Sequence, residues 1–181
     1  EINSSREFPR NSEGSFATLH SGRIVFYYTQ FYGGDSDDSA ARIVEVHSDD
    51  QGRTWSQPRT FLDKEKGDNV MSVSLLRLSN GQLAIFYSVK NSELYFHPYM
   101  RVSDDDGATW SKPRLVIKAP GYFVLNNDRV IQTRSGRILV PAAFNRLLQP
   151  AGFRANGDET RANDLRGKIL RIRVKADDIA G

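Results

Sequence analysis

The feature that most constrains the fold is an octapeptide that occurs twice. Residues 48–55 read SDDQGRTW, and residues 103–110 read SDDDGATW. Both follow one template of Ser, any residue, Asp, any residue, Gly, any residue, Thr and Trp. A motif this long that returns later in the chain indicates a fold built from repeated supersecondary units.

A second pattern has nearly the same period. Strand-like runs flank a Ser-Gly or Asn-Gly pair at Gly22, Gly81 and Gly136, and the step between successive glycines is almost constant. Such pairs between apolar runs are strong signals for β-hairpins. A third strand is expected before each octapeptide, at 41–47 and 95–102. A fourth strand is expected after it, where a Ser-x-Pro-Arg sequence begins.

The repeated unit is therefore four antiparallel strands with a fixed turn between the third and the fourth. Four-stranded sheets repeated at this period are typical of the blades of a β-propeller. No segment keeps a helical period of 3.6 with caps for three turns. The sequence predicts an all-β chain that forms about three blades, which is part of a propeller.

We expect the octapeptide to be a structural turn. Its Asp can accept backbone N–H groups, its Gly can adopt a positive φ, and its Trp is expected to pack inward beneath the turn. A calcium loop is the rival interpretation, but an EF-hand needs a longer series of oxygen ligands ending in Glu. We therefore expect no metal and no cofactor. The structural residues are Ser48, Asp50, Gly52, Thr54 and Trp55, and Ser103, Asp105, Gly107, Thr109 and Trp110.

Composition excludes several other classes of protein. The 181 residues include no cysteine, so neither a disulfide framework nor a thiolate metal site is possible. No apolar run is long enough to span a membrane. The net charge is +3, and the arginines are scattered among strand-like residues, which argues against nucleic-acid binding. The sequence starts at Glu1 with no signal peptide, so any such peptide has been removed or lies outside it.

The two octapeptides resemble the Asp-box, or BNR repeat, of the sialidase superfamily. The resemblance extends over roughly residues 6–146 and includes FPRNSEGSFATLHSGRIVFYY, FYGGDSDDSA and GYFVLNNDRVIQTRSGRILVPAAFNR. It implies a six-bladed propeller, retaining hydrolysis of terminal sialic acids or related anionic glycans, and an extracellular or periplasmic location. Asp-boxes also occur in non-catalytic proteins, so a glycan-binding module is the alternative.

The resemblance also implies a set of site residues. Sialidases grip the substrate carboxylate with three arginines, use an Asp as acid/base and use a Tyr activated by a Glu as nucleophile. Arg10 matches the first arginine, and Asp35 or Asp37 matches the acid/base. Glu13 is either a second catalytic carboxylate or a partner of Arg10. Gln30 stands where the sialidase loop often has an Arg.

Further polar residues are candidates for binding sugar hydroxyls. Asn127, Asp128 and Arg129 precede an apolar strand, where the alternative is a turn that connects blades. Asn145 and Arg146 end the next strand and could face the same side. The later arginines, the nucleophilic Tyr and its Glu have no visible match.

We divide the chain into sialidase-like blades at 1–146, a linker or broken repeat at 147–163, and an additional β-hairpin at 164–181. The last segment resembles a hairpin of the soluble quinoprotein sugar dehydrogenases through its phrase LRGKILRI. Six blades of about 55 residues need around 330 residues. Three blades leave open edges and apolar flanks, so we expect self-association through them.

Overall fold

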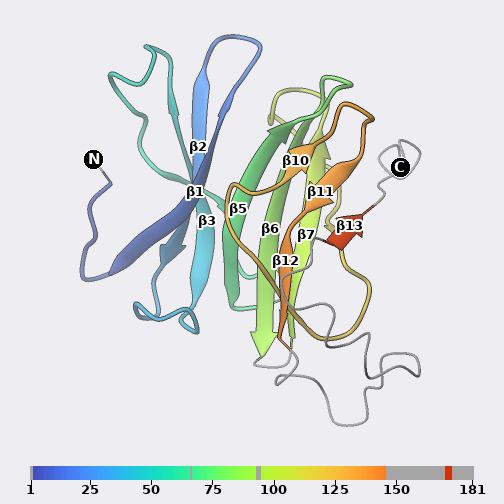
Figure 1. Ribbon diagram of the computed structural model, residues 1–181. Helices are drawn as coiled ribbons and strands as arrows, with labels where there is room; N and C mark the ends of the chain where they lie inside the picture. Colours follow the sequence, from blue (N-terminus) through green and yellow to red (C-terminus); the bar gives the residue numbers. More distant parts are fainter. Residues whose placement is uncertain (1, 66, 93–94, 146–169, 173–181) are drawn as a thin grey trace.

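The computed structural model describes residues 2–65, 67–92, 95–145 and 170–172, and this part of the chain contains strands and no helix (Figure 1). The all-β prediction and the partial propeller are confirmed. None of the described segments is a helix that could cross a membrane.

The first blade contains the four strands that the repeat predicts. They are β1 (Arg10–Thr18), β2 (Ile24–Phe31), β3 (Ala41–Ser48) and β4 (Arg59–Leu62). Each is antiparallel to the next, and β2 pairs with β3 along its full length. Gly22 has a φ of 86° in the β1–β2 turn, which explains why glycine stands there.

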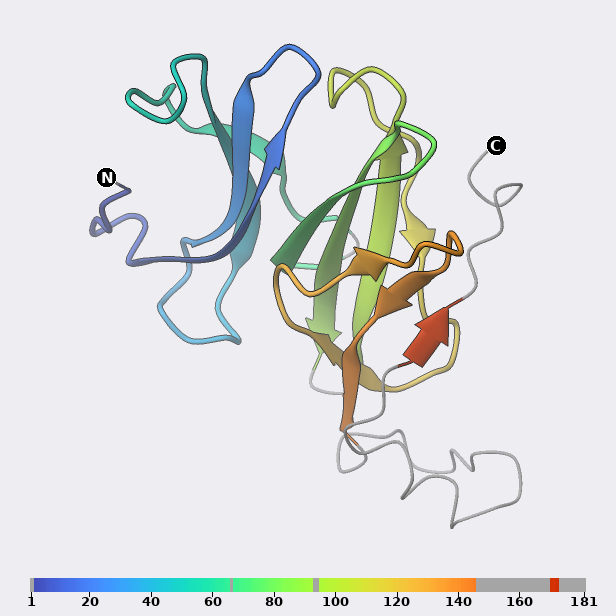
Figure 2. The same ribbon diagram turned by 45° about the horizontal axis from the view of Figure 1, so that its top comes forward.

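The second blade repeats this order. Its strands are β5 (Asn69–Arg77), β6 (Leu83–Ser92), β7 (Tyr95–Ser103) and β8 (Arg114–Leu115). A single parallel pairing, Ala41 with Asn69, joins the first blade to the second. Figure 2 shows the two sheets splayed apart from this junction.

The third blade is built from shorter strands. They are β9 (Tyr122–Leu125), β10 (Ile131–Gln132), β11 (Ile138–Val140), β12 (Ala142–Asn145) and β13 (Leu170–Ile172). The hairpin predicted at Gly136 is present, because β10 pairs with β11 across it. Strand β9 pairs with β12, and β13 pairs with β11. The predicted linker at 147–163 lies outside the described residues, as does most of the segment 164–181, so these boundaries stay predictions.

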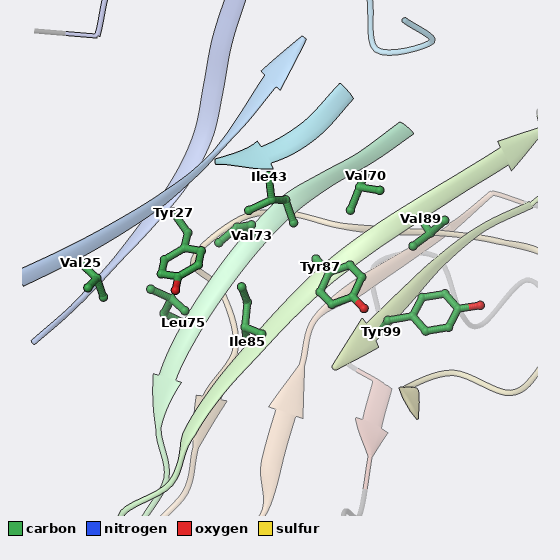
Figure 3. Close-up of a cluster of buried hydrophobic side chains, with 10 residues drawn as sticks. All are labelled: Val25, Tyr27, Ile43, Val70, Val73, Leu75, Ile85, Tyr87, Val89 and Tyr99. Atoms are coloured by element: carbon green, nitrogen blue, oxygen red, sulfur yellow. The ribbon is translucent and has the colours of Figure 1, made fainter. Parts of the chain in front are cut away.

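Hydrophobic cores lie between the blades. Because side chains alternate along a strand, Val25 and Tyr27 of β2 face the second blade, whereas Phe26 and Tyr28 face away from it. Figure 3 shows the first core, to which β2, β3, β5, β6 and β7 contribute. A second core joins β6 and β7 to β11, with Phe86, Met100 and Ile138 among its buried residues.

Both octapeptides form the same turn between the third and fourth strands. Asp50 Oδ1 accepts hydrogen bonds from Ser48 Oγ and Thr54 N, each at 2.8 Å, and its Oδ2 accepts one from Thr54 Oγ1 at 2.6 Å. The bond from Thr54 Oγ1 is the first of several that lower the pKa of Asp50 to about 2. Gly52, with a φ of 87°, donates its N–H to Ser48 Oγ.

The second turn repeats these bonds. Ser103 Oγ and Thr109 N donate to Asp105 Oδ1, and Thr109 Oγ1 donates to Asp105 Oδ2. The pKa of Asp105 is likewise lowered to about 2, above all by the Thr109 hydroxyl. Both Asp side chains are thus occupied by hydrogen bonds within their own turns.

The expectation that both tryptophans pack inward is wrong for Trp55. Trp110 packs against the core between the first two blades, with ring centroids 6.5 Å from Tyr27 and 5.5 Å from Phe61. Trp55 is 38% exposed and contacts the ring of Phe16, which is itself 59% exposed. The reason is the position of the blades: Trp110 has a blade to pack against, and among the described residues Trp55 has none.

Candidate functional site

The ends of the sheets opposite the Asp-box turns carry a group of polar side chains. We call this side the loop face, and we define it by the starts of β1, β5 and β9 and by the β2–β3 loop at 32–40. Arg10, Asn69 and Tyr122 are the first residues of these three strands. The first strands of neighbouring blades therefore bring residues from distant parts of the sequence to one face.

Bulges in β1 and β5, and the turn that follows β9, add polar side chains near this face. Glu13, Ser72 and Asp128 have φ values of 56°, 61° and 51°, which are uncommon for residues other than glycine. The register of β1 shifts between Ser12 and Ser15, as expected for a bulge. The Ser72 hydroxyl donates to Glu13 Oε2 at 3.3 Å, so two of the bulged residues meet.

Arg10 organises the charged part of the loop face. Its Nη1 donates to Asp37 Oδ1 at 2.6 Å and to the carbonyl oxygen of Asp35 at 3.1 Å. Its Nη2 lies 4.0 Å from Glu13 Oε1, and the guanidinium stacks 4.4 Å above the ring of Phe31. The side chain remains 30% exposed, so it is held in place and still open to solvent.

The three predicted catalytic carboxylates differ in their surroundings. Asp37 forms the ion pair with Arg10, whereas Asp35 contacts Arg10 through its backbone carbonyl only. Burial raises the pKa of Glu13, and the neighbouring Asp37 raises it further against the opposing effect of Arg10. The structure thus distinguishes an exposed carboxylate, Asp37, from one with an elevated pKa, Glu13.

The β2–β3 loop is held by two residues that the sequence analysis missed. Asn69 Nδ2 donates to the carbonyl oxygens of Asp37 at 3.1 Å and Ser39 at 2.6 Å. Lys90 forms an ion pair with Asp38 and lies 5.6 Å from the ring centroid of Tyr122. The second blade therefore positions the loop of the first.

A signal for Asn69 was present in the sequence. Asn69 follows Arg10 at the same separation in sequence as Gly81 follows Gly22. The repeat places Asn69 at the position of Arg10 in the second blade, where it could have been singled out. Lys90 carries no such signal, because its partner Asp38 lies in an irregular loop.

The polar run before β10 is tied to the first two blades. Asp128 Oδ1 accepts a hydrogen bond from Ser15 Oγ at 2.7 Å, and Asn127 Nδ2 donates to the carbonyl of Gly14 at 3.5 Å. The backbone N–H of Arg129 donates to Ser74 Oγ at 3.3 Å. The exposed Arg129 side chain makes no ion pair with another described residue.

The two remaining predicted residues lie at the edge of the described chain. Asn145 ends β12 and pairs in register with Tyr122, which places its backbone at the loop face. Arg146 lies outside the described residues. The structure therefore brings Arg10, Glu13, Asp35 and Asp37 together, and it ties Asn127 and Asp128 to β1.

Two Tyr–Glu pairs resemble the nucleophile and base of a sialidase in composition, but not in location. Tyr27 donates to Glu45 Oε2 at 2.8 Å, and Tyr87 donates to Glu65. Both tyrosines are buried in the core between the first two blades, and burial raises the pKa of each well above its usual value. Both phenols are thus protonated and enclosed, so we interpret these pairs as structural.

The described part of the chain contains no candidate metal site. No group of three or more His, Cys, Asp and Glu side chains there could hold an ion. Two acidic residues of the β2–β3 loop are instead paired with cations, Asp37 with Arg10 and Asp38 with Lys90.

The fold has clear relatives among solved structures. The Hadza microbial sialidase Hz136 matches with a TM-score of 0.64 and 19% identity, over 76% of this chain and 33% of that one. A protein of unknown function from Dyadobacter fermentans matches at 0.62 and 18%, over 81% and 50%. The leech intramolecular trans-sialidase matches at 0.60 and 15%, over 78% and 41%. This chain thus spans half or less of these structures.

Sequence comparison supports the same assignment at the level of the family. None of the curated proteins matches the chain. The family model of the BNR repeat-like domain, however, matches residues 22–162, which include both Asp-boxes and the third hairpin. The chain therefore belongs to the BNR repeat-like domain family, and its fold is the Asp-box propeller of the sialidase superfamily.

Proposed function

We propose that this chain is a sialidase-like glycoside hydrolase domain that acts on terminal sialic acids or related anionic glycans. The observation that carries the proposal is the group formed by Arg10, Asp37 and Glu13 at the loop face. It combines a positioned cation with one exposed and one partly buried carboxylate. The fold supports the same class of function but does not by itself specify it.

Arg10 is suited to bind the carboxylate of an acidic sugar. A guanidinium can donate two parallel hydrogen bonds to a carboxylate, and this geometry confers both affinity and orientation. In the described structure Nη1 is occupied by Asp37 and by the Asp35 carbonyl. A bound sugar would use the other donors of the fork or replace the carboxylate of Asp37.

Asp37 and Glu13 are suited to proton transfer. Hydrolysis requires an acid that gives its proton to the glycosidic oxygen as the bond to the anomeric carbon breaks. We assign this role to Asp37, with Asp35 as its alternative in the same loop. Glu13 would keep its proton at a higher pH than an ordinary carboxyl group, because its pKa is raised by burial.

The described residues supply recognition and an acid but not a nucleophile. Their buried Tyr–Glu pairs are enclosed between blades, where no substrate reaches them. We therefore expect the 181-residue chain to bind the sugar and to show at most trace hydrolysis. A non-catalytic glycan-binding module is the second candidate, and this same feature favours it.

Several further expectations belong to this proposal. We propose Asn127, Asp128, Arg129, Asn145 and Arg146 as contacts for sugar hydroxyls or for the rest of the glycan. We also propose an extracellular or periplasmic location, which is the expectation from the resemblance to sialidases. Finally, we propose that the chain associates with itself through open blade edges.

The experiment compares wild-type protein with Arg10→Ala and, as a matched control, with Arg137→Ala, whose exposed arginine lies in the third hairpin turn. Calorimetry would measure the affinity for free sialic acid, and a fluorogenic sialoside would report hydrolysis. We expect Arg10→Ala to weaken binding by roughly 1.5–3 kcal/mol and the control to bind as wild type does. Unchanged affinity in Arg10→Ala would contradict the assignment of the glycan site to the loop face. Turnover of roughly 1–1000 per second would show that a nucleophile is present.

A further inference from the structure

The guanidinium of Arg10 already holds a carboxylate of its own chain. Asp37 Oδ1 accepts a charge-assisted hydrogen bond from Nη1 at 2.6 Å. The carbonyl oxygen of Asp35 accepts another hydrogen bond from the same nitrogen at 3.1 Å. Asp37 is therefore bound to Arg10 in the way that the carboxylate of an acidic sugar would be.

The surroundings of this guanidinium limit where a second carboxylate can bind. The group lies 4.4 Å from the ring centroid of the buried Phe31, so further ligands approach its edge. A bidentate contact uses two neighbouring nitrogens, and either choice includes Nη2. Glu13 Oε1 lies 4.0 Å from Nη2. A sugar carboxylate that bound while Asp37 stayed in place would be the third carboxyl group around one cation, which repulsion between like charges disfavours.

The two carboxyl groups beside Arg10 are not equally free to leave. Glu13 belongs to the bulge of β1, its side chain is 27% exposed, and the Ser72 hydroxyl donates to its Oε2. Asp37 belongs to the β2–β3 loop, and its side chain is 73% exposed. Exposed ion pairs contribute little to stability. Asp37 is therefore the group that a sugar carboxylate can displace from Arg10.

The backbone of the β2–β3 loop is held independently of this ion pair. Asn69 is buried at the start of β5, and its Nδ2 donates to the carbonyl oxygens of Asp37 at 3.1 Å and Ser39 at 2.6 Å. The carbonyl of Asp35 remains bonded to Arg10 whether or not the Asp37 side chain does. A change in the side-chain conformation of Asp37 is thus enough to release its carboxylate, and the loop need not open.

We propose that Asp37 is a built-in substitute for the substrate carboxylate on Arg10, and that an acidic sugar binds by exchanging with it. Before binding, Asp37 holds the guanidinium in place. On binding, its side chain turns away while the backbone stays on Asn69. The exchange also separates Asp37 from the cation, as its proposed role as the acid requires, because a carboxylate paired with a guanidinium has no proton to give. This inference rests on the proposed function, since it concerns the same site.

The test measures the affinity of the full chain for free sialic acid by calorimetry at one fixed ionic strength. It compares wild type with Asp37→Asn and with the matched control Asp38→Asn. Asp38 lies in the same loop with the same side-chain exposure of 73%, but its partner is Lys90. The control therefore removes an equal charge without freeing Arg10. We expect Asp37→Asn to bind about two- to fivefold more tightly than Asp38→Asn, which is the affinity that an exposed ion pair offsets.

A second measurement needs no variant. Carbon-13 NMR of the side-chain carboxyl groups in labelled wild-type protein follows Asp37 and Asp38 as sialic acid is added. We expect the signal of Asp37 to move more than that of Asp38, because only Asp37 loses its cation on binding.

Failure of this inference and failure of the proposed function give different results. Binding that depends on Arg10 but is no tighter in Asp37→Asn than in Asp38→Asn would overturn the exchange, as would an Asp37 signal that does not move while the sugar binds. The sugar would then use other donors of Arg10 with Asp37 in place. No binding by wild type or by either variant would instead refute the proposed function, and the inference with it. Circular dichroism of each variant establishes that it is folded.

Discussion

Trp55 and Trp110 occupy the same position in two copies of one motif, so replacing each with alanine compares identical chemistry in two surroundings. Trp110 lies between two blades and contacts Tyr27 and Phe61. Trp55 lies on the face of the first blade that is turned away from the second blade, contacts the ring of Phe16 and is 38% exposed. In both turns the indole N–H donates to the carbonyl of the motif's glycine.

The magnitudes follow from these surroundings. Truncation of a buried tryptophan costs about 3–5 kcal/mol, because the lost transfer free energy is increased by the cavity that remains. Trp110 is partly buried against the core between the blades, so Trp110→Ala leaves a partly enclosed cavity there and its cost lies at the lower end of this range. Trp55→Ala leaves a hollow that water fills. At about 25 cal/mol per Å² and about 100 Å² buried, less a discount for a compact unfolded state, its cost is about 2 kcal/mol.

Urea unfolding followed by circular dichroism at low protein concentration measures both free energies of unfolding. Low concentration matters because any self-association would add to the apparent stability. We expect Trp110→Ala to lose at least about 1 kcal/mol more than Trp55→Ala. Equal losses, or a larger loss for Trp55→Ala, would refute the claim that only one of the two boxes is packed against a blade.

Three further predictions concern the boxes and the loop face. Because Asp50 and Asp105 have pKa values of about 2, below those of an unfolded chain, their stabilisation is complete above about pH 4 and is lost as the pH falls through 2. Urea midpoints between pH 5 and 2 should therefore depend less on pH in Asp50→Asn, and an unchanged dependence would contradict the assignment. Glu13 has a raised pKa, so it contributes stability at low pH that is lost as the pH rises through that value. Thermal unfolding should therefore show Glu13→Gln to be more stable than wild type at pH 7, with a smaller difference between the two at pH 4. A difference that does not change with pH would argue against a raised pKa of Glu13. Asn69→Ala removes two hydrogen bonds to the β2–β3 loop, so hydrogen exchange should show faster exchange at 35–39 than in wild type, and equal rates would mean that Asn69 does not hold the loop.

The regular part of the fold could be predicted because its signals are short-range. A Ser-Gly or Asn-Gly turn between apolar runs specifies a hairpin locally, and Gly22 and Gly136 mark hairpins as expected. The Asp-box turn is also local, since Ser48, Asp50 and Thr54 bond to one another within a single motif. Repetition of these signals was enough to give the strand order within the first two blades.

The parts that could not be predicted depend on the neighbouring blade. The exposure of Trp55 differs from that of Trp110 only because of what lies beside each blade, which a shared octapeptide template does not encode. The anchors of the β2–β3 loop, Asn69 and Lys90, come from the second blade and are distant in sequence from the loop. Periodicity could have suggested Asn69, but no sequence signal pairs Lys90 with Asp38.

The central claim is that the loop face, and not the aromatic surface around Phe16 and Trp55 or the Asp-box turns, binds an acidic sugar. The most direct test is a titration of the isotopically labelled chain with free sialic acid, followed by amide chemical shifts in two-dimensional NMR. We predict the largest shifts at 10–14, at 32–40 and at 126–129, and their loss in Arg10→Ala. Shifts centred on Phe16 and Trp55, or on the turns at 49–54 and 104–109, would contradict the account and place the sugar on another surface.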